Sequence, residues 1–166
     1  MQEVVNDIVK ILNQLIRSSK DASALCQTWF FNGHKRYYQC AALYYTECLL
    51  WFKKKVFDMY QIMPADDGSA TPYAPASFKE HFGQWERLLM TSIDRLIELN
   101  RRLFNDAGLE NCTTRDVIFY LFKDRERTHR KINQFNRSGW NPIELHAIDR
   151  ELHVKMKKKM KKWRIK

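Results

Sequence analysis

The side chain best placed to carry out chemistry is Glu47, a lone carboxylate within residues 37–52, YYQCAALYYTECLLWF. It is the only acidic residue between Asp21 and Asp58. A helix that is apolar on every side is usually covered by neighbours on every side, and an unpaired buried carboxylate is costly. We therefore expect a central, buried helix. In it, Glu47 is a metal ligand, one half of an ion pair, or a residue at the edge of the packing.

A second group that could bind a ligand or partner is the basic run near the C-terminus. The chain has a net charge of +10, and residues 151–166 contain eight Lys/Arg against one Glu, which is +7 of the total. Met156, Met160 and Trp163 are interleaved with the lysines and form one apolar edge of a helix. Such a basic amphipathic helix can neutralise phosphates, lie on an anionic membrane, or dock on a partner protein.

Of these partners we expect nucleic acid, bound largely without sequence specificity, because nothing in these residues reads base edges in an identifiable way. A membrane surface, a protein partner, and self-association through the aromatic-rich helices are the alternatives, and a solvated tail is the alternative without a partner. The residues expected to contact nucleic acid are Lys155, Lys157, Lys158, Lys159, Lys161, Lys162, Arg164, Lys166, Arg127, Arg130 and Lys131.

Catalysis has little support in the sequence. There is no Gly-rich phosphate loop, no recognisable Ser or Cys nucleophile motif, and no zinc-ligand spacing. The four cysteines have no C-x-x-C spacing, and the N-terminus lacks the basic region of a signal peptide. Buried, reduced thiols in a cytoplasmic protein are therefore expected, with a secreted helical bundle of the cytokine type as the alternative.

All of these residues are expected on helices. Five glycines, four prolines and no alternating β-branched runs indicate an all-α chain. Residues 64–76 hold three of the prolines, so we expect a long crossover between the ends of a bundle. A bundle over residues 1–140 and a basic amphipathic helix over 141–166 are the expected units. Apolar residues recur at helical spacing over 3–31, 34–62, 77–106, 113–135 and from 141 onward.

Local signals mark several helix ends. Ser77-Phe78-Lys79-Glu80 has the pattern of a capping box, in which side chains satisfy the first free amides of a helix. Asn141 followed by Pro142 predicts an N-cap and a first helical residue. Gly33 is expected to end the first helix with a positive φ, and Ser138-Gly139 to end the fourth.

The fourth helix, TRDVIFYLFKDRERTHRKI, resembles the last bundle helix of the ferritin superfamily, especially of the bacterioferritins. That helix carries a Glu-x-x-His motif, here Glu126-Arg127-Thr128-His129. The junction Gly33-His34-Lys35-Arg36 is similar to the turn between the first two bacterioferritin helices. The resemblance implies a four-helix bundle with one long crossover, and metal ligands at Glu47, Glu86, Glu126 and His129.

The ligand set that the resemblance implies is incomplete in this sequence. A di-metal carboxylate site takes a Glu from each of two helices and a Glu-x-x-His from each of the other two. Three residues after Glu47 stands Leu50 instead of His, and the first helix has Asn13 and Gln14 where a Glu is needed. We therefore expect no intact di-metal site and no cofactor, with iron as the alternative.

Together these observations predict an all-α, ferritin-like bundle that binds a polyanion, most of all nucleic acid, and is not an enzyme. This combination resembles the DNA-protecting branch of the ferritin superfamily, whose members join a bundle to basic extensions. One alternative is a ferritin-like di-metal oxidase or iron-handling protein. The other is an interaction bundle that docks into a larger assembly.

Overall fold

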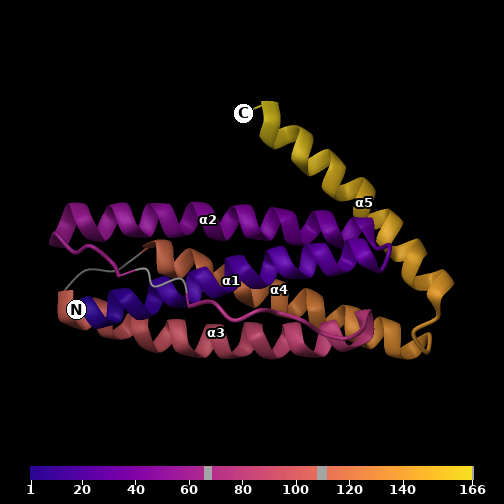
Figure 1. Ribbon diagram of the computed structural model, residues 1–166, viewed down its shortest axis with the longest axis horizontal. Helices are drawn as coiled ribbons and strands as arrows, with labels where there is room; N and C mark the ends of the chain where they lie inside the picture. The colour runs from indigo at the N-terminus through magenta and orange to yellow at the C-terminus, as the bar shows by residue number, and fades with distance from the viewer. Residues whose placement is uncertain (66–68, 108–111, 166) are drawn as a thin grey trace.

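A computed structural model describes residues 1–65, 69–107 and 112–165, with side chains left out for 104–107, 112 and 163–165. These residues form α1 (Gln2–Thr28), α2 (Asn32–Tyr60), α3 (Phe78–Ala107), α4 (Cys112–Arg137) and α5 (Pro142–Ile165), and no strand lies among them (Figure 1). The all-α prediction, with one long crossover, is confirmed. Within the described ranges, no helix is long and apolar enough to cross a bilayer.

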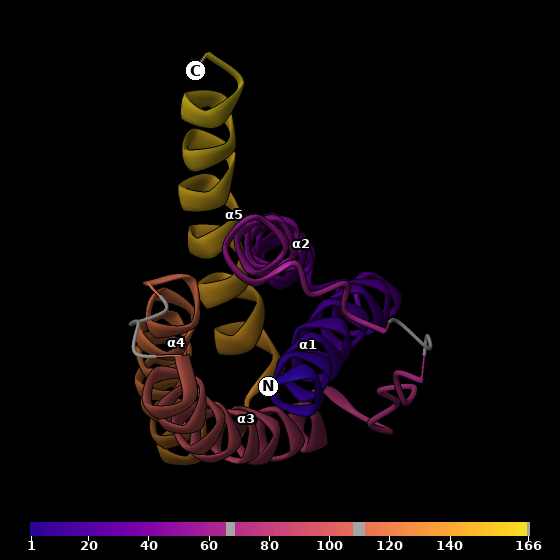
Figure 2. The same cartoon turned by 90° about the vertical axis from the view of Figure 1, so that its left-hand side faces the viewer.

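The first four helices form the bundle, and α5 lies across one end of it. Seen along the bundle, α1 to α4 occupy four corners, and the distal part of α5 projects past α2 (Figure 2). α1 packs on α2 and α3, α2 also packs on α4 and α5, and α3 packs on α4. At that end meet the turn between α1 and α2, the start of α3 and the turn between α4 and α5 (Figure 1).

The core changes in character along the bundle. Near the N-terminus of α1 it is aliphatic, with Val5 and Ile8 almost completely buried. At the α5 end it is aromatic: Phe31 stacks on Phe78 with 3.9 Å between ring centroids, and Phe78 meets Phe82 edge to face at 4.9 Å. Such ring pairs add stabilisation beyond the area they bury, so they help to join the elements that meet at the α5 end.

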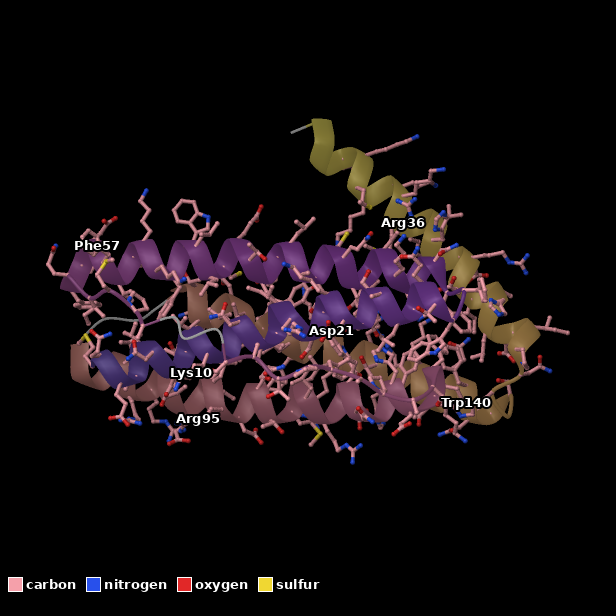
Figure 3. The ribbon with its side chains drawn as sticks, viewed as in Figure 1. Lys10, Asp21, Arg36, Phe57, Arg95 and Trp140 are labelled. Carbon is pink, nitrogen blue, oxygen red and sulfur yellow. The ribbon has the colours of Figure 1, made fainter. Side chains whose placement is uncertain are left out.

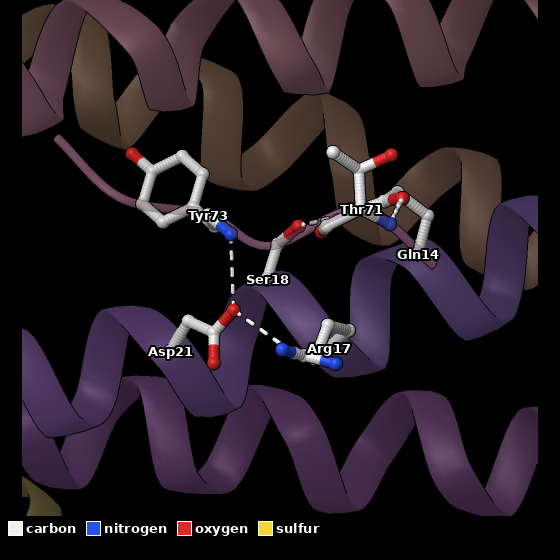
Figure 4. A network of polar contacts seen from close by, with 6 residues as sticks. All are labelled: Gln14, Arg17, Ser18, Asp21, Thr71 and Tyr73. Carbon is white, nitrogen blue, oxygen red and sulfur yellow. Dashed lines mark hydrogen bonds and ion pairs between the residues drawn. The ribbon is translucent and has the colours of Figure 1, made fainter. Parts of the chain in front are cut away.

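Polar residues on the outer side of α1 hold the long crossover against the bundle (Figure 4). The Gln14 side chain donates to the Thr71 carbonyl and accepts from the Thr71 amide, both at 2.8 Å. Asp21 accepts from the Tyr73 amide at 3.0 Å and from Arg17 at 3.1 Å. Gln14 and Asp21 are seven residues apart and so share a face of the helix. Gln14, in the region where a ferritin-like ligand was sought, therefore has a structural role.

Most of the expected helix ends are found. The Glu80 amide donates to Ser77 Oγ at 3.2 Å, while Glu80 Oε2 accepts from the Ala76 amide at 3.1 Å. Asn141 Oδ1 accepts from the Ile143 amide at 2.9 Å, and α5 begins at Pro142. α4 ends at Arg137, and the glycine that follows, Gly139, has a φ of +64°.

The expectation for Gly33 is wrong. α1 ends at Thr28, and the positive φ of 65° is found at Phe30 instead. Gly33 lies in the first turn of α2, where a Cβ would be 2.0 Å from the Asp149 carbonyl oxygen. Glycine is needed there because the backbone of α5 passes directly over α2.

The expectation that α2 is buried on every side is also wrong. Its inner face is fully covered, with Tyr38 and Phe52 at 0% exposure. On its outer face Leu43 is 54%, Leu50 62% and Trp51 64% exposed. The bundle supplies neighbours for one face of this helix, and α5 crosses it near its N-terminal end, beside Arg36 (Figure 3).

Candidate metal centre and buried polar groups

The four residues of the implied metal site do not meet inside the bundle. Glu47 and Glu126 are exposed on α2 and α4. Glu86 Oε2 lies 3.3 Å from His129 Nδ1, but His129 is 63% exposed, so this is a surface pair between α3 and α4. Within the described part of the chain, no three His, Cys, Asp or Glu side chains are placed to hold a metal. These residues do not fit a di-metal centre.

The carboxylate that does lie inside the bundle is Asp124 of α4, which is 3% exposed. It accepts hydrogen bonds from Tyr37 Oη at 2.5 Å and from Trp85 Nε1 at 3.0 Å. Burial raises the pKa of Asp124, while the bond from Tyr37 and the charge of Arg127 oppose the rise. Both oxygens of Asp124 are therefore bonded, one to α2 and one to α3, so Asp124 links α4 to these two helices.

A second buried group is His81 of α3. Its Nε2 lies 2.7 Å from the Tyr38 hydroxyl, and its Nδ1 lies 2.7 Å from the Tyr73 hydroxyl. The Tyr73 hydroxyl donates to the His81 carbonyl at 2.9 Å, so it accepts from Nδ1–H and Tyr38 donates to Nε2. Burial lowers the pKa of His81 to about 3, so the ring is neutral and links the crossover to α2.

The third buried group joins α5 to the bundle. Asp149 of α5 accepts from the amides of Gly33 and His34, at 3.0 and 2.8 Å, at the N-terminus of α2. His34 Nδ1 lies 2.6 Å from the same carboxylate. Burial lowers the pKa of His34 to about 4. Burial opposes ionisation of Asp149 as well, but the bonds from His34 and the two amides bring its pKa below the usual value.

The basic residues expected to bind nucleic acid fall into two sets. Arg127, Arg130, Lys131 and Lys155 line a cleft of about 400 Å³ between α4 and α5. The second set lies outside the cleft and consists of Lys157, Lys158, Lys159, Lys161 and Lys162, which are exposed, as are Arg130 and Lys155 of the first set. The side chains of Arg164 and Lys166 lie outside the described residues.

The apolar edge of α5 faces its own bundle. Met156 is 5% exposed, and Met160 Sδ accepts from Arg36 of α2 at 3.7 Å. The third expected member of this edge, Trp163, has a side chain outside the described residues. Met156 and Met160 are therefore engaged within the chain.

Sequence reasoning missed Asp124, His81, His34 and Asp149 as buried groups. One signal was available for Asp124, which stands three residues after Leu121 and four before Thr128, on the buried stripe of α4. The partners of these groups come from other helices, so spacing along the sequence could not identify them.

Neither a family model nor a curated protein matches the sequence. Solved structures do match nearly the whole chain. A humanized archaeal ferritin matches with a TM-score of 0.81 at 12% identity, over 93% of this chain and 95% of that one. An open-pore ferritin from the archaeon Archaeoglobus fulgidus matches with a TM-score of 0.80 at 11% identity, over 93% and 96%. Apo-ferritin from Pseudo-nitzschia multiseries matches with a TM-score of 0.75 at 11% identity, over 89% of this chain and 95% of that one. The chain therefore has a ferritin-like fold.

This finding corrects the functional expectation. Nucleic-acid binding is contradicted as the leading interpretation, because the solved structures that match 89–93% of this chain are ferritins, and one of them was studied soaked in iron. The expectation also treated the apolar edge of α5 as free for a partner, whereas Met156 is buried and Met160 contacts Arg36 of α2.

Proposed function

We propose, from the ferritin-like fold as premise, that this chain is a non-catalytic subunit of an iron-handling assembly. We further propose that it associates with a second copy of itself through the outer face of α2. Iron enters this proposal as cargo of the assembly, by analogy with the ferritin described as soaked in iron. The observation that carries the proposed self-association is the outer face of α2, where large apolar side chains are exposed.

The outer face of α2, defined here as Leu43, Glu47, Leu50, Trp51 and Lys54, occupies one side of the helix, because these residues follow each other at spacings of four, three, one and three. All five are exposed, and Lys54 Nζ lies 5.6 Å from the centre of the Trp51 ring. An apolar centre that contains Trp, with charges at its margins, is typical of protein interfaces.

A second copy of the chain is a complementary occupant for this face. In an antiparallel pairing about a two-fold axis between positions 50 and 51, Leu50 of each copy faces Trp51 of the other. The same axis sets each Glu47 opposite Lys54 of the second copy, so two ion pairs flank the apolar centre. Such self-complementarity is what a two-fold interface requires.

The interior of the bundle supports a non-catalytic role. The oxygens of Asp124 accept from Tyr37 and Trp85, and the ring nitrogens of His81 are bonded to Tyr38 and Tyr73, so these two buried groups are already engaged by side chains of the bundle and the crossover. The cysteines Cys26, Cys40 and Cys48 are free and buried, which supports the further proposal that the protein works in a reducing compartment such as the cytoplasm.

The test begins with analytical ultracentrifugation of the purified chain and of a Leu50→Glu/Trp51→Glu variant. The wild type is expected to sediment as a dimer or a larger multiple. The variant is expected to sediment as a smaller species with unchanged helical circular dichroism. Ile143→Glu is the matched control, because Ile143 is 79% exposed on α5 and lies outside the outer face of α2; its assembly state should not change.

Iron content tests the second half of the proposal. After incubation with ferrous iron in air and desalting, the wild type should retain iron and the Leu50→Glu/Trp51→Glu variant should not. Two irons per chain in the non-assembled variant would overturn the non-catalytic role, because they would require a centre within one bundle. A monomeric wild type would overturn self-association.

A further inference from the structure

We infer that the cleft between α4 and α5 is a binding site for a small, multiply charged phosphate-class anion. The cleft measures about 400 Å³, a size that suits small ligands. Four cationic side chains line it against one carboxylate: Arg127, Arg130, Lys131, Lys155 and Glu151. The inference is independent of the outer face of α2, and it goes beyond the proposed function.

Arg127 is the residue that points most directly to an anion. Its guanidinium lies on the face of the Tyr37 ring, 3.8 Å from the centroid, so its plane is held in place. Its two terminal nitrogens are buried and have no acceptor among the described residues, although buried polar groups are normally bonded. Asp124 acts on Arg127 through its charge, but its oxygens already accept from Tyr37 and Trp85. A fixed guanidinium fork matches the paired oxygens of a phosphate group.

The charges around the cleft are not balanced within it. Lys131 is half-buried, and burial, followed by the charges of Arg127 and Lys155, lowers its pKa, while Glu151 raises it. Like charges that crowd a partly buried site repel one another. A bound anion would neutralise this repulsion and offer acceptors to the cationic side chains that line the cleft.

The volume of the cleft suits a small anion. Its other walls are Gln134, which can donate one more hydrogen bond, and the apolar residues Ile148 and Leu152. Two helices from one chain close its sides, so a ligand would connect α4 to α5. The shared chemistry is a phosphate group, which can come from free phosphate or pyrophosphate or from a nucleotide.

The experiment is calorimetric titration of the full chain with inorganic phosphate, pyrophosphate and ADP at constant ionic strength. Pyrophosphate is expected to bind one per chain. Arg130→Gln/Lys155→Gln should weaken this binding by about tenfold or more, as loss of charged hydrogen bonds does. The matched control is Lys157→Gln/Lys158→Gln, which removes the same charge from exposed positions of α5 outside the cleft; it should change binding less than about twofold.

ADP that binds more tightly than pyrophosphate would identify a nucleotide as the source of the phosphate group, and tighter pyrophosphate would identify a free anion. Arg127→Lys keeps the charge and removes the fork, and it too should weaken binding. Two results would overturn the inference: no saturable binding of any of the three ligands at millimolar concentration, or equal weakening in both double variants, which would mean diffuse attraction. Repeating the titration with Leu50→Glu/Trp51→Glu separates this site from assembly, because that variant keeps the cleft.

Discussion

Both faces of α2 carry large apolar side chains, but only the inner face is buried within the chain. On the inner face Tyr38, Tyr45 and Phe52 are completely buried. On the outer face Leu50 and Trp51 are more than 60% exposed. What differs is the neighbourhood, since α1 and α4 pack against the helix from inside while α5 crosses it near one end. The apolar sequence of a helix therefore predicts that its surface is buried, but not whether the neighbours that bury it belong to the same chain.

The difference has an energetic meaning. Burial of a large apolar side chain contributes about 1.5–3 kcal/mol, and on the inner face that contribution is already part of folding. On the outer face it is available for association. Substitutions on the inner face should therefore change the stability of the chain, and substitutions on the outer face should change its assembly.

The largest effect is expected on the inner face. Phe52→Ala should lower the free energy of unfolding by about 3–5 kcal/mol, because it leaves a cavity in a closely packed core. Leu50→Ala, two positions away on the outer face, is the matched control and should change it by less than about 1 kcal/mol. Urea denaturation of both variants measures the difference. Equal effects would abolish the distinction between the faces.

The next effect concerns the buried histidine at the start of the inner face. The pKa of His34 is about 4 in the folded chain and about 6.5 when unfolded. The unfolded state therefore binds more protons between these values, so stability falls as pH decreases from 6.5 to 4, by roughly 3 kcal/mol for this residue. His81, with a pKa of about 3, acts in the same direction. Asp124, whose raised pKa favours the folded state at low pH, opposes them.

Denaturation at pH 7, 6 and 5 measures this slope, and ring proton shifts in NMR spectra report the charge of each histidine. Both buried rings should remain neutral at pH 5. A ring of His34 that becomes charged near pH 6.5 in the folded protein would contradict the expectation, and it would mean that α5 does not cover the start of α2.

The parts of the fold that sequence reasoning predicted depend on neighbours in sequence. The capping residues Ser77 and Glu80, the N-cap Asn141 and the break at Gly139 act within a few residues of themselves. The inner stripe of α2 is likewise local, because residues three and four apart share a face. These signals located the helices and the long crossover, whereas the ferritin-like arrangement was implied by the resemblance of the fourth helix and of the junction after the first.

The parts that sequence reasoning could not predict depend on residues far along the chain. Gly33 was interpreted as a helix terminator, but the reason for a glycine is the backbone at Asp149, which follows it by 116 positions. Asp124 takes its partners from α2 and α3. Glu47 is exposed because the neighbouring helices cover the other face of α2. The composition of α2 does not predict which face they cover.

A third prediction tests the junction where α5 crosses α2. In Gly33→Ala the new methyl group would lie 2.0 Å from the Asp149 carbonyl oxygen and 2.7 Å from the His153 amide nitrogen, so α5 must shift. The cost should be about 1–3 kcal/mol, as is usual for overpacking. The matched control is Gly83→Ala on α3, where nothing lies within 4 Å of the added carbon and where alanine should favour the helix slightly. Urea denaturation of both variants checks the difference, and a Gly33→Ala chain as stable as wild type would mean that α5 is not held against α2.

The smallest effect on the isolated chain is expected at Trp51, the most exposed of the large apolar residues on the outer face of α2. Trp51→Ala removes its contact with Lys54, at 5.6 Å, and little buried surface. The free energy of unfolding should therefore change by less than about 1 kcal/mol. Dissociation of the proposed dimer should change far more, because Trp at the centre of an interface commonly contributes 2 kcal/mol or more to binding, which is roughly thirtyfold in the dissociation constant. Urea denaturation below the dissociation concentration and sedimentation above it measure the two quantities separately. A loss of several kcal/mol in the isolated chain would show that Trp51 packs within its own bundle, and the two faces of α2 would then be alike.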